Sequence, residues 1–457
     1  MVDAHPVADL DAEELTHLDL VLSSSDQLAA ETRVIAESLQ SAVVSVAGVL
    51  APLRPGLMPL GFSRDHGQDF LAVGSTADGH DVEVLPPGRT VTRIEVSDLP
   101  DPARRPEKFR ETVQGFVGLL DAAPLHASDD ARARFLVDVA ACGLPVCVAD
   151  PATLHGLLPV EIINVFASTD PRTLTSELDR EQSSLRQRRV VHEYGSPRAV
   201  LDRLLFQADR PGLRKPSISV TVASHRPEMI PVWAGQLAVQ QYSDFEIVAA
   251  LHGDRFQQAD IDLAQEILGG RLTVCRVPTS HTLGDALNAA ATQAGGDLIS
   301  KWDDDDLYDV EHLCDLVRAL DYSGAALVGK AAEFAYLANM GITIRRLKTS
   351  TERFSQTICG ATLTIRRSDL IELGGWRRSR RRVDSLLIED VRASGGTTYR
   401  TSGFGFIMLR AGGDGHSHTW TADDNYFLRG AIDQRRGLDT AFAAVNAPAS
   451  VVEWWES

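Results

Sequence analysis

One segment of the chain reads Leu298-Ile299-Ser300-Lys301-Trp302-Asp303-Asp304-Asp305-Asp306, an apolar run with strand character that ends in four consecutive carboxylates. Four negative charges at one strand end repel one another unless something neutralises them. Hard divalent cations such as Mn²⁺ and Mg²⁺ bind carboxylate oxygens and bridge them to phosphate. A solvated acidic turn is the alternative, but this run follows Ile299 and Trp302 directly and does not lie in a polar linker. We therefore expect a Mn²⁺ or Mg²⁺ site here.

The residues before this segment alternate between apolar runs typical of buried strands and helical patterns. Strands are predicted at 218–223, 245–251, 272–277 and 297–302, and helices at 230–240, 261–268 and 283–294. This alternation indicates an α/β fold with a mostly parallel sheet and helices on both faces. Ligands of such sheets bind beyond the carboxyl ends of the strands, which is where the four aspartates lie.

A linker rich in proline and basic residues divides the chain, Arg210-Pro211-Gly212-Leu213-Arg214-Lys215-Pro216. We therefore predict one domain at 1–210 and a second at 216–445. The first also has an α/β pattern, for which we expect a Rossmann-like fold. Its strand-like runs are 42–50, 70–74, 81–85 and 145–149, and its predicted helices are 26–39, 131–142, 172–190 and 197–206.

Composition excludes several classes of protein. The 457 residues carry a formal net charge of −18, which argues against a nucleic-acid binder. Five scattered cysteines, none at zinc-ligand spacing, indicate buried thiols in a reducing compartment. The acidic, polar beginning of the chain has no signal-peptide pattern, and no apolar stretch reaches the about 20 residues of a membrane span. We expect a cytoplasmic protein, with peripheral contact to the inner face of the membrane left open.

Four elements between residues 216 and 420 resemble the family 2 glycosyltransferases, which have the GT-A fold. They are the strand 217–223 with Ser224-His225-Arg226-Pro227, the helix 283–290 with Leu283-Gly284 and Asn288, the acidic run 302–306, and Cys359-Gly360-Ala361 followed by Leu373-Gly374-Gly375-Trp376. Each is a weak signal alone, but their order and spacing make the whole specific. In the family's pattern they correspond to the first nucleotide loop, the helix before the metal strand, the DXD motif and the acceptor-side turn.

The resemblance implies metal-dependent transfer of a sugar from a nucleotide donor, with inversion at the anomeric carbon. The leaving diphosphate gains negative charge, which a divalent ion stabilises as a Lewis acid. On the family pattern Asp305 ligates the metal and Asp303 approaches the ribose or diphosphate, while Asp304 and Asp306 lie around them or are solvated. The donor-binding residues that we predict are Ala223, Ser224, Arg226, His252, Asp254, Leu283, Gly284, Asn288, Asp303 and Asp304.

Inversion needs a general base, and two aspartates compete for that role. The family usually supplies the Asp of a Glu-Asp pair that has a glycine eleven residues later. Glu389-Asp390 is the literal pair, but Gly395 follows it by only five residues. Asp384 lacks the glutamate but has the right spacing to Gly395 and an apolar residue at the third position. Six residues place the two about 120° apart around a helix, so we favour Asp384 as catalytic and keep Asp390 as the alternative.

Two further segments carry candidate site residues. After a predicted strand at 404–410, the residues His416, His418 and Trp420 resemble a late His-Thr-Trp element of the family, and we predict His418 as a metal ligand. The basic run 377–382 precedes Asp384, and we expect it to hold a phosphate of the acceptor, to face an anionic membrane or to be a solvated loop.

The first domain resembles part of a GT-B glycosyltransferase, on the residues 19–25, on Ala140-Ala141-Cys142-Gly143-Leu144-Pro145-Val146 and on the helical region 189–205. An intact GT-B enzyme needs two Rossmann halves, for which 210 residues are too few. We therefore expect a non-catalytic module for packing, acceptor binding or assembly.

The leading hypothesis is an enzyme that moves a sugar from a UDP-sugar or other nucleotide sugar to a cell-surface glycan or a lipid-linked glycan, as in cell wall or capsule polysaccharide biosynthesis. A nucleotidyltransferase is the alternative enzyme, although Ser224-His225-Arg226-Pro227 has no glycine-rich phosphate cradle. An inactive scaffold in glycan assembly is the non-enzymatic alternative. Nucleic acid is not expected as a partner, and the oligomeric state is left open.

Overall fold

The computed structural model describes residues 70–73, 91–94, 99–100, 106–113, 115–121, 128–174, 176–207, 209–346, 351–410 and 424–456. The chain forms two compact units, Met1–Arg214 and Lys215–Ser457, which are described separately below. The elements predicted before residue 70, the strand predicted at 81–85 and the residues His416, His418 and Trp420 lie outside the described residues.

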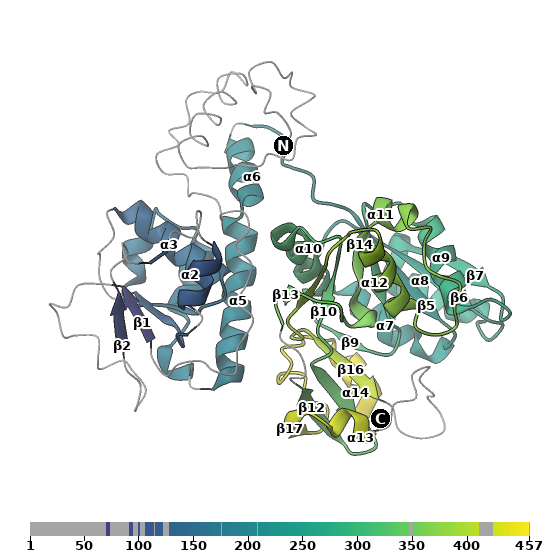
Figure 1. Ribbon diagram of the computed structural model, residues 1–457. Coiled ribbons are helices and arrows are strands. Elements are labelled where there is room, and N and C mark those ends of the chain that lie inside the picture. The colour runs from purple at the N-terminus through teal and green to yellow at the C-terminus, as the bar shows by residue number, and fades with distance from the viewer. Residues whose placement is uncertain are drawn as a thin grey trace. The chain divides into compact units, whose positions relative to one another are not determined.

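Unit 1 is built around a parallel sheet with the strand order β2-β1-β3-β4 (Figure 1). Its strands are β1 (Phe70–Val73), β2 (Val91–Ile94), β3 (Leu119–Asp121) and β4 (Val146–Val148). Its helices are α2 (Pro106–Val113), α3 (Asp129–Ala141), α4 (Val160–Ala167), α5 (Glu177–Gly195) and α6 (Pro197–Gln207). The helix predicted at 131–142 and the strand predicted at 145–149 correspond to α3 and β4, so the α/β character expected for this unit is confirmed.

Polar side chains complete the core of unit 1. The edge strand β4 is protected by Gln187 of α5, whose Oε1 accepts from the backbone N of Val146 at 2.8 Å while its Nε2 donates to the carbonyl of Val146 at 2.7 Å. A buried ion pair joins Arg132 of α3 to Asp121 at the end of β3. Gln187 thus occupies the backbone groups of Val146 to which a further strand would bond.

Unit 2 contains an eight-stranded sheet in the order β13-β15-β10-β14-β8-β5-β6-β7. Its strands are β5 (Ile218–Ser224), β6 (Phe245–His252), β7 (Leu272–Val277), β8 (Leu298–Trp302), β10 (Leu327–Lys330), β13 (Arg353–Phe354), β14 (Thr364–Arg366) and β15 (Thr398–Thr401). The strands β7, β6, β5 and β8 are parallel, as predicted. Beyond them β14 runs antiparallel between β8 and β10, so the whole sheet is mixed.

Helices pack over this sheet (Figure 1). They are α7 (Ile230–Ala238), α8 (Gln258–Leu268), α9 (Leu283–Gln293), α10 (His312–Ser323), α11 (Arg367–Glu372) and α12 (Val383–Ala393), with α13 (Asp424–Leu428) and α14 (Ala449–Glu456) later in the chain. The one-turn helices η7 (Pro227–Met229) and η9 (Gly360–Thr362) precede α7 and β14. Within the described residues, none of the helices combines the length and the apolarity that crossing a bilayer requires.

A second sheet of unit 2 has the order β17-β12-β11-β16-β9 and was not predicted as a sheet. It consists of β9 (Leu307–Tyr308), β11 (Phe334–Leu337), β12 (Ile342–Arg346), β16 (Phe406–Arg410) and β17 (Ala431–Arg436). The strand predicted at 404–410 is β16. Because β9 directly follows the four aspartates and pairs with β16, this sheet anchors the C-terminal side of the acidic run.

The strand register brings three loops to one edge of the main sheet. Val222 of β5 pairs with Trp302 of β8, and Ser224 pairs with Leu251 of β6. The residues that follow β5, β6 and β8 therefore meet beyond the carboxyl ends of these strands, where α/β sheets bind their ligands.

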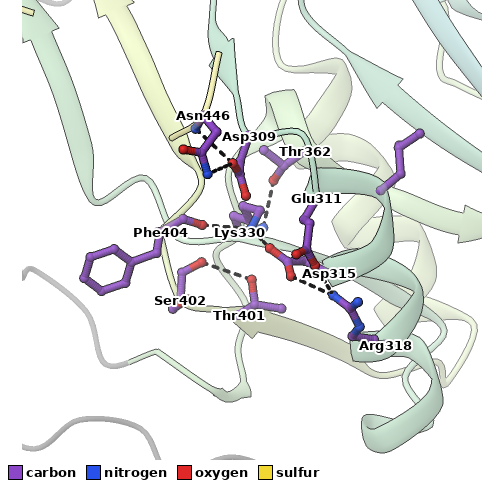
Figure 2. Close-up of polar contacts among 12 residues, drawn as sticks. Asp309, Glu311, Asp315, Arg318, Lys330, Thr362, Thr401, Ser402, Phe404 and Asn446 are labelled. Carbon is purple, nitrogen blue, oxygen red and sulfur yellow. Dashed lines mark hydrogen bonds and ion pairs between the residues drawn. The ribbon is translucent and has the colours of Figure 1, made fainter. Parts of the chain in front are cut away.

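A buried polar network behind this edge joins α10, β10 and the segments before β14 and β16 (Figure 2). The Nζ of Lys330 donates to Oδ2 of Asp315 and to the carbonyl of Phe404, both at 2.8 Å, and its backbone N donates to Thr362 at 2.8 Å. Lys330 is 1% exposed, so its charge depends on these partners. The network fixes η9, which ends at Thr362, and the beginning of β16.

Replacing Lys330 by Met should destabilise unit 2 by about 3 kcal/mol, because the buried Asp315 loses the closer of its two described cationic partners and keeps Arg318, at 3.4 Å. All six tryptophans lie at or after Trp233, so tryptophan fluorescence during urea unfolding reports on unit 2. The control is Lys215→Met, at an exposed position, which should change the free energy of unfolding by less than about 1 kcal/mol. Equal effects of the two substitutions would show that the network contributes no stability.

Candidate active site

The four aspartates after β8 point to two different sets of partners. Asp303, Asp305 and Asp306 place carboxylate oxygens within 4.8 Å of one another. Asp304 instead forms an ion pair with Arg226 and accepts a hydrogen bond from Ser224. The run thus supplies one cluster that could hold a cation and one carboxylate that secures the first loop.

Arg226 is the basic side chain that joins the first loop to the acidic run. Its Nη2 contacts Asp304 and lies 2.8 Å from Oδ2 of Asp305. Burial alone would lower the pKa of Arg226, but the two carboxylates outweigh burial and raise it. Burial, together with the charge of Asp305, raises the pKa of Asp304 to about 6. Ser224 and Arg226 were predicted as donor-binding residues, and their described contacts position the carboxylates.

Asp306 is buried and is held by the second sheet. Its Oδ1 accepts from the backbone N of Leu409 in β16 at 3.0 Å. Burial and the charges of Asp305 and Asp303 raise its pKa well above the usual range. The alternative that Asp304 and Asp306 are solvated is therefore wrong, because both side chains are enclosed by the fold.

Lys301 is a residue that the sequence analysis did not single out. Its side chain is buried in β8, where Nζ forms an ion pair with Asp303, lies 3.2 Å from Oδ1 of Asp384 and donates to the carbonyl of Gly360 at 3.1 Å. One ammonium group therefore connects the acidic cluster to the favoured base. A lysine inside an otherwise apolar buried strand was the available signal, since lysine is almost never fully buried without a partner.

The two candidate bases lie on the same helix, α12, in different surroundings. Asp384, in the first turn, packs against the backbone of Gly360, where any added Cβ would overlap its carboxylate. Asp390 forms a two-point ion pair with Arg377, with Nε donating to Oδ2 at 2.9 Å. Asp384 is therefore connected to the acidic cluster through Lys301, whereas Asp390 is paired with Arg377 of the basic run.

Helix α9 holds three of the predicted donor-binding residues against the turn that contains Trp376. A capping box between Thr282 and Asp285 starts the helix. The side-chain amide of Asn288 donates to the carbonyl of Trp376 at 2.7 Å and accepts from its backbone N at 2.8 Å. The backbone N of Gly284 donates to the carbonyl of Ser379 at 3.1 Å.

These contacts give α9 a structural role at the site. An added Cβ at Gly284 would overlap the carbonyl of Arg377, so only glycine lets the basic run approach so closely. Leu283 packs in the same apolar core as Trp376. The contacts explain why Gly284 and Asn288 stand at their positions, and binding of the donor by these residues stays a prediction.

The remaining predicted donor residues lie at the ends of β5 and β6. Ala223 is half-buried just before Ser224, and Asp254 accepts from the hydroxyl of Thr279 at 3.4 Å. The Nε2 of His252 is buried, and no described residue offers it a hydrogen bond. A buried polar atom without a protein partner is a position where a ligand or water would bind.

The site fits a divalent metal ion on two grounds. Three carboxylate oxygens within 4.8 Å of one another match the spacing of oxygen ligands around one Mn²⁺ or Mg²⁺. Burial also raises the pKa values of Asp303 and Asp306, a cost that a bound cation would offset. The predicted ligand Asp305 belongs to this cluster, whereas the predicted ligand His418 lies outside the described residues.

A mixed α/β sheet with a carboxylate cluster at the carboxyl ends of its parallel strands is the arrangement expected of a GT-A-like domain. Residues 226–365 match the family model of glycosyl transferase family 2. Unit 2 therefore contains a region that matches glycosyl transferase family 2. The match agrees with the predicted family and gives the nucleotidyltransferase alternative no support. No curated protein matches the chain significantly.

Several solved structures are similar to part of the chain. S. aureus TarS is 17% identical, with 42% of this chain and 37% of that chain covered and a TM-score of 0.36. TarS 1-349 in complex with UDP-GlcNAc is 16% identical over 46% of this chain and 64% of that chain, with a TM-score of 0.37. The mannosyltransferase PcManGT from Pyrobaculum calidifontis, in complex with GDP-Man and Mn²⁺, is 15% identical over 49% of this chain and 66% of that chain, with a TM-score of 0.35. The chain thus spans less than two thirds of each of these structures.

Binding of Mn²⁺ should strengthen as the pH rises from 5.5 to 7.5, by about tenfold or more. The cluster carboxyls Asp303 and Asp306 have raised pKa values, and Asp304 beside them has a pKa of about 6, so in the metal-free protein they keep protons that ordinary aspartates lose. A metal ion needs the ionised carboxylates and must displace these protons. Calorimetric titration with MnCl₂ at pH 5.5, 6.5 and 7.5 measures the affinity.

The control for this measurement is Asp305→Asn, which should bind Mn²⁺ weakly at every pH. An affinity that does not change over this pH range would show that the buried carboxyls do not ligate the ion.

Proposed function

We propose that this protein is an inverting glycosyltransferase that depends on a divalent metal ion. It would move a sugar from a nucleotide sugar, with UDP-sugars as the first class to test, to a cell-surface glycan or a lipid-linked glycan. The observation that carries the proposal is the contact of Lys301 with both Asp303 and Asp384. This contact fixes a candidate base beside a candidate metal cluster, at the edge of the sheet where ligands bind.

In this proposal Asp303, Asp305 and Asp306 hold Mn²⁺ or Mg²⁺, and the ion, when bound, stabilises the charge of the leaving nucleoside diphosphate as a Lewis acid. Asp384 accepts the proton of the acceptor hydroxyl as that oxygen attacks the anomeric carbon. Lys301 keeps the Asp384 carboxylate in place, so that it faces the reacting hydroxyl without rearrangement. Attack on the face opposite the leaving group inverts the configuration.

The nucleotide would lie over the loops that follow β5 and β6. His252 offers the buried Nε2 that lacks a partner among the described residues, and Asp254 lies two residues further on. Burial, and then the charge of Arg226, lowers the pKa of His225, so this ring is neutral at pH 7. Neutral imidazoles and backbone groups can hydrogen bond to a base or ribose without adding charge near the metal site.

The remaining parts of the chain have supporting roles in this proposal. Unit 1 would be a non-catalytic module, related to part of a GT-B enzyme, for acceptor binding or assembly. The enzyme would act in the cytoplasm, where nucleotide sugars are available, with the basic run 377–382 able to meet an anionic acceptor or membrane surface.

The decisive experiment is hydrolysis of a panel of UDP-, GDP-, dTDP- and CMP-sugars by the purified full chain, with Mn²⁺ and with EDTA. We expect slow, metal-dependent release of one nucleotide, reduced about a hundredfold or more in Asp305→Ala, because the metal loses a ligand. Chromatography of the released nucleotide gives the rate. If no nucleotide sugar is turned over and calorimetry shows no metal-dependent nucleotide binding, the domain is an inactive scaffold.

A second experiment separates the two candidate bases. Asp384→Asn should lower the hydrolysis rate by about a hundredfold, because a positioned base contributes that much or more. Asp390→Asn is the matched control on the same helix and should retain more than about a tenth of the rate, since its contacts are with Arg377. A larger loss of hydrolysis rate in Asp390→Asn than in Asp384→Asn would indicate that Asp390 is the base and that Asp384 serves only as an ion-pair partner of Lys301.

A further inference from the structure

A second pocket lies in unit 2 at the strand edge formed by β13 and β15, on residues that the catalytic proposal does not use. It encloses about 650 Å³, a volume typical of sites for small ligands. The strand β13, the segment 355–357 that follows it, the C-terminal end of α12 and the strand β15 supply its walls. It is open to solvent, so a segment of a longer molecule could enter it.

Three arginines line this pocket, Arg353, Arg392 and Arg400. Arg353 and Arg400 are direct partners across the antiparallel pair β13–β15, which places two positive charges side by side. Burial, and then the charge of Arg353, lowers the pKa of Arg400. Its Nη1 is fixed by hydrogen bonds to the carbonyl of Thr357 at 3.0 Å and to its hydroxyl at 2.7 Å. The fold therefore places Arg353 and Arg400 side by side, with Glu333 as an acidic neighbour of Arg400, and an anion in the pocket would interact favourably with both arginines.

The other lining groups suit a sugar. Among the described residues that line the pocket, none is acidic, while Ser355, Gln356 and Thr357 supply hydroxyl and amide groups. The Phe354 side chain is 44% exposed and meets Tyr399 edge to face, with ring centroids 5.5 Å apart. An exposed aromatic ring beside hydrogen-bonding groups can contact both the apolar face and the hydroxyls of a saccharide.

Helix α12 connects this pocket to the candidate active site. Asp384 lies in its first turn and Arg392 in its last, eight residues later. At 1.5 Å per residue the two positions are about 12 Å apart along the helix axis. An oligosaccharide of a few residues could reach from one position to the other.

We propose that the pocket lined by Arg353, Arg392 and Arg400 binds a phosphate- or carboxylate-bearing sugar of the acceptor glycan, a short distance from the sugar that receives the transferred residue. This inference rests on the proposed function, because it assigns the pocket to the acceptor. A free inorganic anion could use the same arginines, and the experiment below distinguishes these two sources.

The test is calorimetric binding to the full chain, in EDTA and without donor, of three probes: hexagalacturonate, neutral maltohexaose and inorganic tripolyphosphate. We expect hexagalacturonate to bind, maltohexaose to bind at least about tenfold more weakly, and Arg353→Gln/Arg392→Gln to lose about tenfold or more in affinity for hexagalacturonate. Both arginines are exposed, so their replacement leaves the fold intact. Arg436→Gln, at an exposed arginine on β17, is the matched control and should bind like the wild type.

Three results would overturn the proposal: equal binding of hexagalacturonate and maltohexaose, binding that the double substitution does not change, or binding of tripolyphosphate alone, which would indicate a site for free anions. Because neither donor nor metal is present, failure of the nucleotide-sugar assay would not affect this outcome. Conversely, intact donor hydrolysis without arginine-dependent binding of hexagalacturonate would disprove the assignment of the pocket to the acceptor. The proposed function would then still stand.

Discussion

The constraint on which the site depends is the crowding of four consecutive carboxylates at the end of β8, where Asp304 and Asp306 are buried and Asp303 and Asp305 are partly buried. Arg226 and Lys301 neutralise part of this charge through ion pairs with Asp304, Asp305 and Asp303. Burial and the charges of Asp305 and Asp303 raise the pKa of Asp306. Perturbed carboxyls with basic groups close by, at the edge of a sheet, mark a candidate ligand site.

The rest of unit 2 can be understood as support for this cluster. The second sheet holds Asp306 through the backbone of Leu409, and the network around Lys330 fixes η9. Gly360 of η9 in turn packs against Asp384, which shares Lys301 with the cluster. Elements far apart in the chain thus meet around Lys301. No single sequence motif could therefore have described the site.

The local sequence pattern was sufficient to predict the strands and helices in the first half of unit 2. The strands β5 to β8 and the helix α9 lie where the apolar runs and the helical pattern predicted them, because each is a regular element with a clear sequence pattern. The antiparallel insertion of β14 and the second sheet were missed, since strands of two to five residues carry too little periodicity to distinguish them from loops. Contacts with distant strands, and not local propensity, stabilise such short strands.

The sequence alone indicated the family resemblance of the domain, the parallel α/β pattern of its first half and the position of the acidic run, because these depend on local composition and spacing. Tertiary structure decided which partners each carboxylate has. It turned Asp304 towards Arg226, gathered Asp303, Asp305 and Asp306, and committed Asp390 to Arg377 while joining Asp384 to Lys301. Neighbouring aspartates are alike in a sequence, and only the partners that folding brings to each one set its direction, burial and charge.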